Sequence, residues 1–115
     1  MRFATIVLLT AVTAACGSSF PPPNDEYSAA QADVGRAESG GAPSVPDARL
    51  HLQLAQEDLQ KSKGLIDSGD NKRAADLIAV ARVEAQLALS LAKQLQAEDQ
   101  ARKAQSDVAK AKGGQ

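Results

Sequence analysis

The longest uninterrupted helical pattern in the chain runs from Asn71 to Lys112, where neither glycine nor proline occurs. At 1.5 Å per residue, a helix of this length would be about 60 Å long, roughly twice the diameter of a small domain. Its apolar residues recur at spacings of three and four, which is the repeat of a helix face. They are Ala74, Ile78, Ala81, Ala85, Ala88, Ala92 and Leu95, with Leu77, Val80, Val83, Leu87 and Leu91 beside them. So broad an apolar surface predicts contact with more than one neighbour.

The segment before this run predicts its partner helix. We expect that helix to extend from Val45 or Pro46 to Ser68, because small or apolar residues again recur at spacings of three and four. They are Val45, Ala48, Leu52, Ala55, Leu59, Ser62 and Ile66. This stripe is typical of a helix that faces another helix.

The residues between the two helices predict a tight turn. Gly69 suits the position just after a helix, and Asp70 suits the position just before the next one. A short connection makes the two helices antiparallel neighbours. Counting outward from the turn, large residues face small ones: Ile66 faces Ala74, Leu59 faces Ala81 and Leu52 faces Ala88. Such pairs predict closely spaced helix axes.

A shorter helix is expected from Asp25 to Glu38, with a stripe formed by Tyr27, Ala30, Val34 and Ala37. Asn24 is its expected N-cap, and Ser44 with Asp47 has the spacing of a capping box before the following helix. Gly40 and Gly41 interrupt the pattern between them. The predicted fold is therefore all-α: an antiparallel helical hairpin with a shorter N-terminal helix, in up-down-up order, and a long protruding C-terminal helix.

Residues 96–115 form the expected C-terminal helical extension, beyond the reach of the other helices. It carries a narrow stripe of small side chains at spacings of four and three: Ala97, Ala101, Ala104, Val108 and Ala111. Glu98 with Arg102 and Asp99 with Lys103 are expected to pair along it. Two interpretations stay open. The extension is a solvated helical tail, or its stripe docks a helix from a second copy or an envelope partner.

The first residues have the layout of a secretory signal, with Arg2 before an apolar run and then small residues. Thr13-Ala14-Ala15-Cys16 resembles the lipobox of bacterial lipoproteins. The resemblance implies that residues 1–15 are removed and that Cys16 receives a diacylglycerol and an N-acyl chain such as palmitate. The alternative is an ordinary secretory peptide with an incidental cysteine.

A spacer is expected at residues 16–24, the lipidated cysteine included. Its three prolines favour an extended polyproline II conformation, which would hold the folded part up to about 25 Å from the membrane. In bacterial lipoproteins an Asp after the cysteine commonly marks inner-membrane retention. Gly17 in that position therefore implies the periplasmic face of the outer membrane.

The composition argues against catalysis and against several classes of ligand. With 13 basic and 14 acidic residues, the net charge of −1 offers no excess to bind nucleic acid. One Cys, one His and three aromatic residues argue against a metal site, a cofactor, a nucleophilic triad or a small-molecule substrate pocket. His51 is expected to be a partly exposed polar residue, and capping explains Asp70.

The residues also resemble the bacterial lipoproteins that carry domain of unknown function 4398. The resemblance rests on an Ala-rich first helix at Tyr27 to Glu38, Pro46-Asp47-Ala48 at the start of the second helix, the Gly69-Asp70 turn, and Arg73-Ala74-Ala75 onward in the third. It covers residues 25–95 and implies a location and a fold but no activity.

Three functions remain as hypotheses. The first is a lipid-anchored structural or protein-interaction module of the cell envelope. The second is an envelope tether or spacer associated with peptidoglycan, resembling murein lipoproteins; Gly113-Gly114-Gln115 after Lys112 and the breaks at Gly40-Gly41 and Gly69 argue against it. The third is a helical ligand-binding domain, which the closely packed alanine stripes disfavour.

Overall fold

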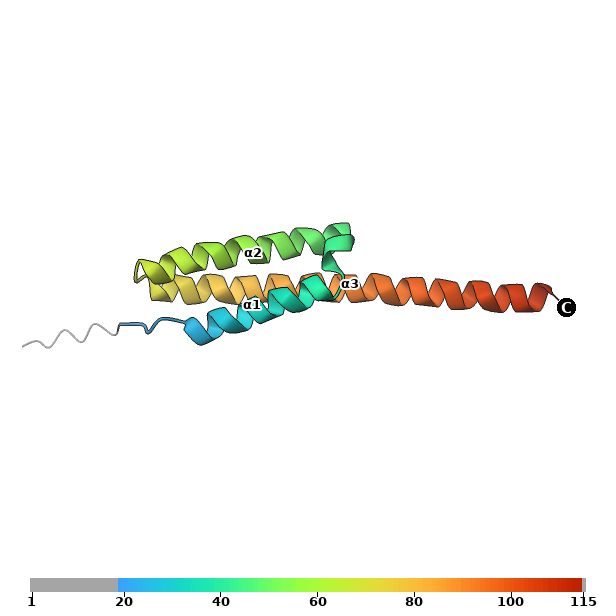
Figure 1. Cartoon of the computed structure of the whole chain (residues 1–115), viewed down its shortest axis with the longest axis horizontal. Helices are drawn as coiled ribbons and strands as arrows, with labels where there is room; N and C mark the ends of the chain where they lie inside the picture. The colour runs from blue at the N-terminus through green and yellow to red at the C-terminus, as the bar shows by residue number, and fades with distance from the viewer. Residues whose placement is uncertain (1–18, 115) are drawn as a thin grey trace, which may run out of the picture.

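The computed structural model describes residues 19–114 and contains three α-helices over that range. They are α1 (Asn24–Ser39), α2 (Pro46–Asp67) and α3 (Asn71–Gly113), with a short 3-10 turn, η1 (Ala42–Ser44), between α1 and α2. Figure 1 shows α1 and α2 lying along the first part of α3, while the rest of α3 extends well beyond them. The all-α hairpin with a shorter first helix and a protruding last helix is confirmed.

The buried apolar residues of the three α-helices all belong to the stripes that the helical spacing predicts. In α2 they are Ala48, Leu52, Ala55, Leu59 and Ser62, and in α3 they are Ala74, Ile78, Ala81, Ala85, Ala88 and Ala92. From α1, Ala30, Val34 and Ala37 join the same core. Alanine predominates, so the helices approach closely and each residue buries little apolar area.

The turn between α2 and α3 forms at the glycine that the sequence predicts for it. Gly69 has a left-handed backbone with φ of 82°, which glycine adopts at little steric cost. The N–H of Asp70 donates to the Leu65 carbonyl over 2.9 Å, and the N–H of Gly69 donates to the Ile66 carbonyl over 3.0 Å. These two bonds form a Schellman motif, which ends α2 and reverses the chain.

The predicted side-chain caps are wrong. Asn24 lies inside α1, and α2 is preceded by Val45 in an extended conformation because Ser44 belongs to η1. None of the three α-helices has a side-chain hydrogen bond at its N-cap. Asp70 does precede α3, but its carboxylate binds Arg73 over 3.0 Å instead of a backbone N–H. At the start of α3, Asp70 therefore forms an ion pair with Arg73 in place of a side-chain cap.

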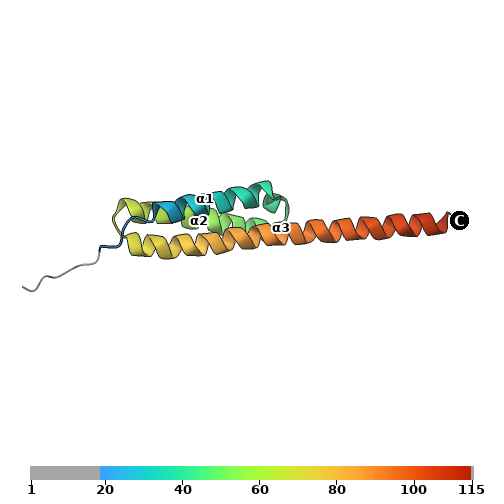
Figure 2. The same cartoon turned by 90° about the horizontal axis from the view of Figure 1, so that it is seen from below.

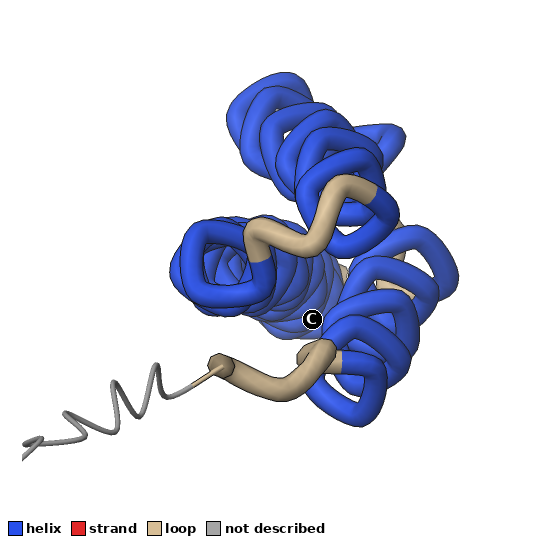
Figure 3. Tube along the Cα trace, turned by 90° about the vertical axis from the view of Figure 1, so that its left-hand side faces the viewer, coloured by secondary structure: helices blue, strands red, loops and turns tan. Residues whose placement is uncertain are grey.

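Helix α1 packs more extensively against α3 than against α2, and Figure 3 shows the three helices arranged as a triangle. The close approach depends on Gly40, where an added Cβ would overlap Leu89 Cδ1 and lie 2.9 Å from the Arg36 carbonyl oxygen. The amide of Gln96 also donates to the Gly40 carbonyl over 3.0 Å. The end of α1 is therefore fixed to α3.

Two glycine substitutions, one within α1 and one just after it, should have opposite effects. Gly40→Ala should lower the free energy of unfolding by about 1–3 kcal/mol, because the added methyl has no room. Gly35→Ala should raise it by about 0.5–1 kcal/mol, since Gly35 is helical and an added Cβ there meets nothing within 4 Å. Thermal unfolding of both variants checks this; a stabilised Gly40→Ala would contradict the packing.

Candidate functional site

The predicted lipidation residue, Cys16, lies outside the described residues. The nearest described segment, residues 19–23, contacts the helical body at two points. The Nδ2 amide of Asn71, at the start of α3, donates to the Phe20 carbonyl over 2.8 Å, and Pro23 is buried. Residues 19–23 are thus attached to the helical body through the Phe20 carbonyl and Pro23.

This attachment gives the molecule two different ends. The N-terminal segment joins the body beside the α2–α3 turn, and the C-terminal end of α3 lies at the opposite end of the rod (Figure 2). Helix α3 has 43 residues and is therefore about 64 Å long at 1.5 Å per residue. A group attached to the N-terminal segment is near the turn and far from the tip of α3.

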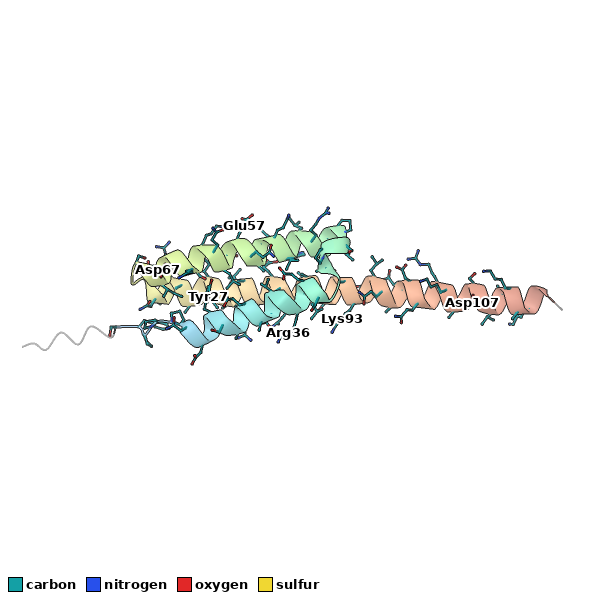
Figure 4. The ribbon with its side chains drawn as sticks, in the orientation of Figure 1. Tyr27, Arg36, Glu57, Asp67, Lys93 and Asp107 are labelled. Atoms are coloured by element: carbon teal, nitrogen blue, oxygen red, sulfur yellow. The ribbon has the colours of Figure 1, made fainter. Side chains whose placement is uncertain are left out.

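Every member of the stripe predicted in the extension is exposed. Its members are Ala97, Ala101, Ala104, Val108 and Ala111, and in Figure 1 α1 and α2 lie along only the first part of α3. Asp107, labelled in Figure 4, lies on this free part of the helix. The expected i,i+4 pairs do not form, because Arg102 binds Asp99 and Glu98 accepts from Gln94 over 3.0 Å.

A buried carboxylate in α1 was not predicted. The Asp33 side chain is 1% exposed and binds Arg82 of α3, with 3.0 Å between Oδ2 and Nε. Gln86 Nε2 lies 3.4 Å from the same oxygen, and Arg36 binds the other oxygen. Charged partners compensate for the removal of this carboxylate from water. The cluster joins α1 to α3 at a defined register.

His51 pairs with Glu84 across the α2–α3 contact, with 2.5 Å between Nδ1 and Oε2. The two side chains are 28% and 25% exposed, so His51 is the partly exposed polar residue that was expected. Its carboxylate partner was not expected. The pair joins α2 to α3.

An open groove of about 570 Å³ lies between α1 and α2. Val34 and Leu59 are among the residues that line it. Gly35 and Gly64 also line it and add no side chains there. The alanine stripes therefore leave open surface space between α1 and α2, and smaller open pockets also lie where α2 meets α3. The groove lacks the aromatic enclosure typical of small-molecule sites.

Two further features bear on function within residues 19–114. No group of three or more His, Cys, Asp or Glu side chains there is placed to hold a metal ion. None of the helices in that range combines the length and apolar character needed to cross a membrane.

The residues that sequence reasoning missed are polar ones whose partners lie far away in the chain. Asp33 and Arg82 are 49 positions apart, and His51 and Glu84 are 33 apart. One signal was available for Asp33, since it lies three residues after Ala30 and next to Val34 on the apolar face of α1. A carboxylate on such a face predicts a charged partner in a neighbouring helix.

Comparison with known proteins yields one family. The model of "Domain of unknown function (DUF4398)" matches residues 25–104. The match spans α1, α2 and the first part of α3, and it continues into the extension. Searches of curated proteins and of solved structures give no match.

Proposed function

The chain belongs to the DUF4398 family, whose description names no activity, and we propose that it is a lipid-anchored lipoprotein of the bacterial envelope, held on the periplasmic face of the outer membrane. In this proposal the helical body is a structural or protein-interaction module and not an enzyme. The observation that carries it is the Thr13-Ala14-Ala15-Cys16 sequence directly after an apolar run.

The shape of the body supports this role. The end that follows Cys16 in the chain is attached beside the α2–α3 turn through the Asn71 amide and Phe20 carbonyl. A lipid on Cys16 would therefore hold the turn end near the membrane and leave the tip of α3 free to reach about 64 Å away. Acyl chains contribute about 0.8 kcal/mol per buried methylene, so two or more chains give a stable anchor.

The anchor is tested by removing the thiol that would carry it. Cys16→Ser should abolish acylation and leave the chain unprocessed or soluble, because the diacylglycerol is attached through sulfur. Metabolic labelling with a clickable palmitate analogue, followed by membrane fractionation, measures both effects. Ser18→Ala is the matched control and should keep the label. An unchanged label in the Cys16→Ser protein would contradict the proposal.

The tether associated with peptidoglycan remains the second candidate. The observation that favours it is the long free part of α3, which would point away from the membrane and ends in Lys110 and Lys112. Purification of the chain from crosslinked envelopes separates the two candidates. A protein partner supports the interaction module, whereas covalent or tightly bound peptidoglycan fragments support the tether.

A further inference from the structure

Helix α3 carries a second stripe of side chains that α1 and α2 leave uncovered. We name it the outer stripe: Val80, Val83, Leu87, Ser90, Gln94, Ala97, Ala101, Ala104, Val108 and Ala111. All ten residues are exposed, and they include the large side chains Val80 (48%), Val83 (64%), Leu87 (40%) and Val108 (55%). The stripe therefore continues the one predicted in the extension back along the bundle.

The outer stripe lies on the side of α3 opposite to the core. Val83, for example, is two residues from both Ala81 and Ala85, which are buried. Two residues correspond to about 200° around a helix with 3.6 residues per turn. Along the shared length the outer stripe therefore faces away from the core, although residues of α2 lie beside its edge near Val80 and Gln94.

The spacing of the outer stripe is that of a coiled-coil seam. From Val80 to Ala111 its members alternate between steps of three and four, which assigns Val80, Leu87, Gln94, Ala101 and Val108 to heptad position a and the others to position d. The stripe spans about 46 Å. We propose that its occupant is the outer stripe of a second copy of this chain, parallel and in register.

The charges beside the stripe favour a parallel pair. In a parallel coiled coil the g residue of one helix faces the e residue of the next heptad in the other. Here Lys93 faces Glu98 of the second copy, and Asp107 faces Lys112. Gln100 faces Gln105 between them. Each contact occurs twice by symmetry, and all the charged ones join opposite signs.

The antiparallel arrangement brings like charges together. Overlap of the whole outer stripe would then place Leu87 opposite Ala104, with the symmetry axis between Gln94 and Ala97. Near that axis Lys93 approaches its own copy, and so does Glu98. Gln94 adds a further preference, because a polar residue at an a position pairs with its equivalent only in register.

The pair is expected to be weak without a membrane. A strip about 46 Å long and 10 Å wide covers about 460 Å² per copy, below the roughly 800 Å² per partner of a standard stable interface. Anchoring both copies by the same end would orient them in parallel and raise their effective concentration. To this extent the inference rests on the proposed function.

Single cysteines report the pairing directly. In the full chain, in envelope membranes, Ala104→Cys places a thiol on the outer stripe, and Ser106→Cys places one on the far side of the same exposed helix. After oxidation, the Ala104→Cys protein should give several-fold more disulfide-linked dimer than the Ser106→Cys protein. The parent chain, whose one cysteine is Cys16, gives the background. Fractionation of the same samples tests the anchor separately.

Charge exchange tests the register. In the Ala104→Cys protein, Lys93→Glu should reduce the crosslinked dimer, because it places an acidic side chain opposite Glu98 of the second copy. Adding Glu98→Lys should restore the dimer, because position 93 is then acidic and position 98 of the second copy is basic, so the two side chains again carry opposite charges.

Three results would overturn the proposal. The first is an equal yield of disulfide-linked dimer from the Ala104→Cys and Ser106→Cys proteins. The second is a yield from the Ala104→Cys protein that Lys93→Glu does not change. The third is efficient crosslinking between one copy carrying Leu87→Cys and another carrying Ala104→Cys. The last result would establish an antiparallel pair.

Discussion

Leu59→Asp is expected to lower the free energy of unfolding by at least about 4 kcal/mol, because it removes a buried apolar side chain and places a carboxylate in the core. Leu59 is 6% exposed and belongs to the cluster that joins all three helices. A small domain has about 5–15 kcal/mol of stability in total, and this core consists mainly of alanine. The variant should therefore be largely unfolded at physiological temperature.

The neighbouring residue provides the control. Gln60 is exposed on α2, so Gln60→Asp introduces the same charge without entering the core. It should change the free energy of unfolding by less than about 0.5 kcal/mol. Thermal melting followed by far-ultraviolet circular dichroism should separate the two variants by more than about 15 °C. Coincident melting curves would show that the packing of α2 on α3 is wrong.

Arg82→Met should be the most damaging change to a charged side chain, with a loss of about 2–3 kcal/mol. It removes the guanidinium that lies 3.0 Å from the buried Asp33 carboxylate. Arg36 and Gln86 remain, but the carboxylate then loses one of its two charged partners while it stays buried. Chemical denaturation measures the loss.

Two further variants test whether the uncompensated buried charge of Asp33 causes this loss of stability. Arg102→Met breaks the exposed pair with Asp99 and should cost less than about 0.5 kcal/mol. The double variant Asp33→Leu with Arg82→Met should be more stable than Arg82→Met alone, because no buried charge is then left uncompensated. If Arg82→Met were as harmless as Arg102→Met, the Asp33 cluster would not stabilise the bundle.

The helices and their core could be predicted because both follow from local periodicity. The spacing of Leu52, Leu59 and Ala81 defines faces that any compact arrangement must bury, and Gly69 marks where the chain reverses. These signals lie within single helices or single turns. They therefore specify the hairpin without reference to distant residues.

The caps and polar contacts could not be predicted for a different reason. Ser44 has the spacing of a capping residue, but the 3-10 turn at η1 takes it out of that position. Asp33 and His51 are buried or half-buried by helices that are remote in the sequence. Which polar residue meets which depends on the rotation of each helix, and alanine-rich faces constrain that rotation only loosely.

The candidate surface was predicted in part. The breadth of the apolar residues on α3 indicated more than one neighbour, and both α1 and α2 pack against it. The same breadth also includes Val80, Val83 and Leu87, which remain exposed with α1 and α2 in place. The sequence indicated the stripe only in the extension. Within the bundle, the packing of α1 and α2 determines which face of α3 is left exposed, and the sequence alone does not give that packing.

The intact mass of the chain purified from envelope membranes tests the central proposal most directly. The account predicts a chain that begins at Cys16 and carries the added mass of a diacylglycerol and an N-linked acyl group. Fragmentation should place that mass on the first residue. A chain that keeps residues 1–15, or one that is cleaved without added lipid, would contradict the account.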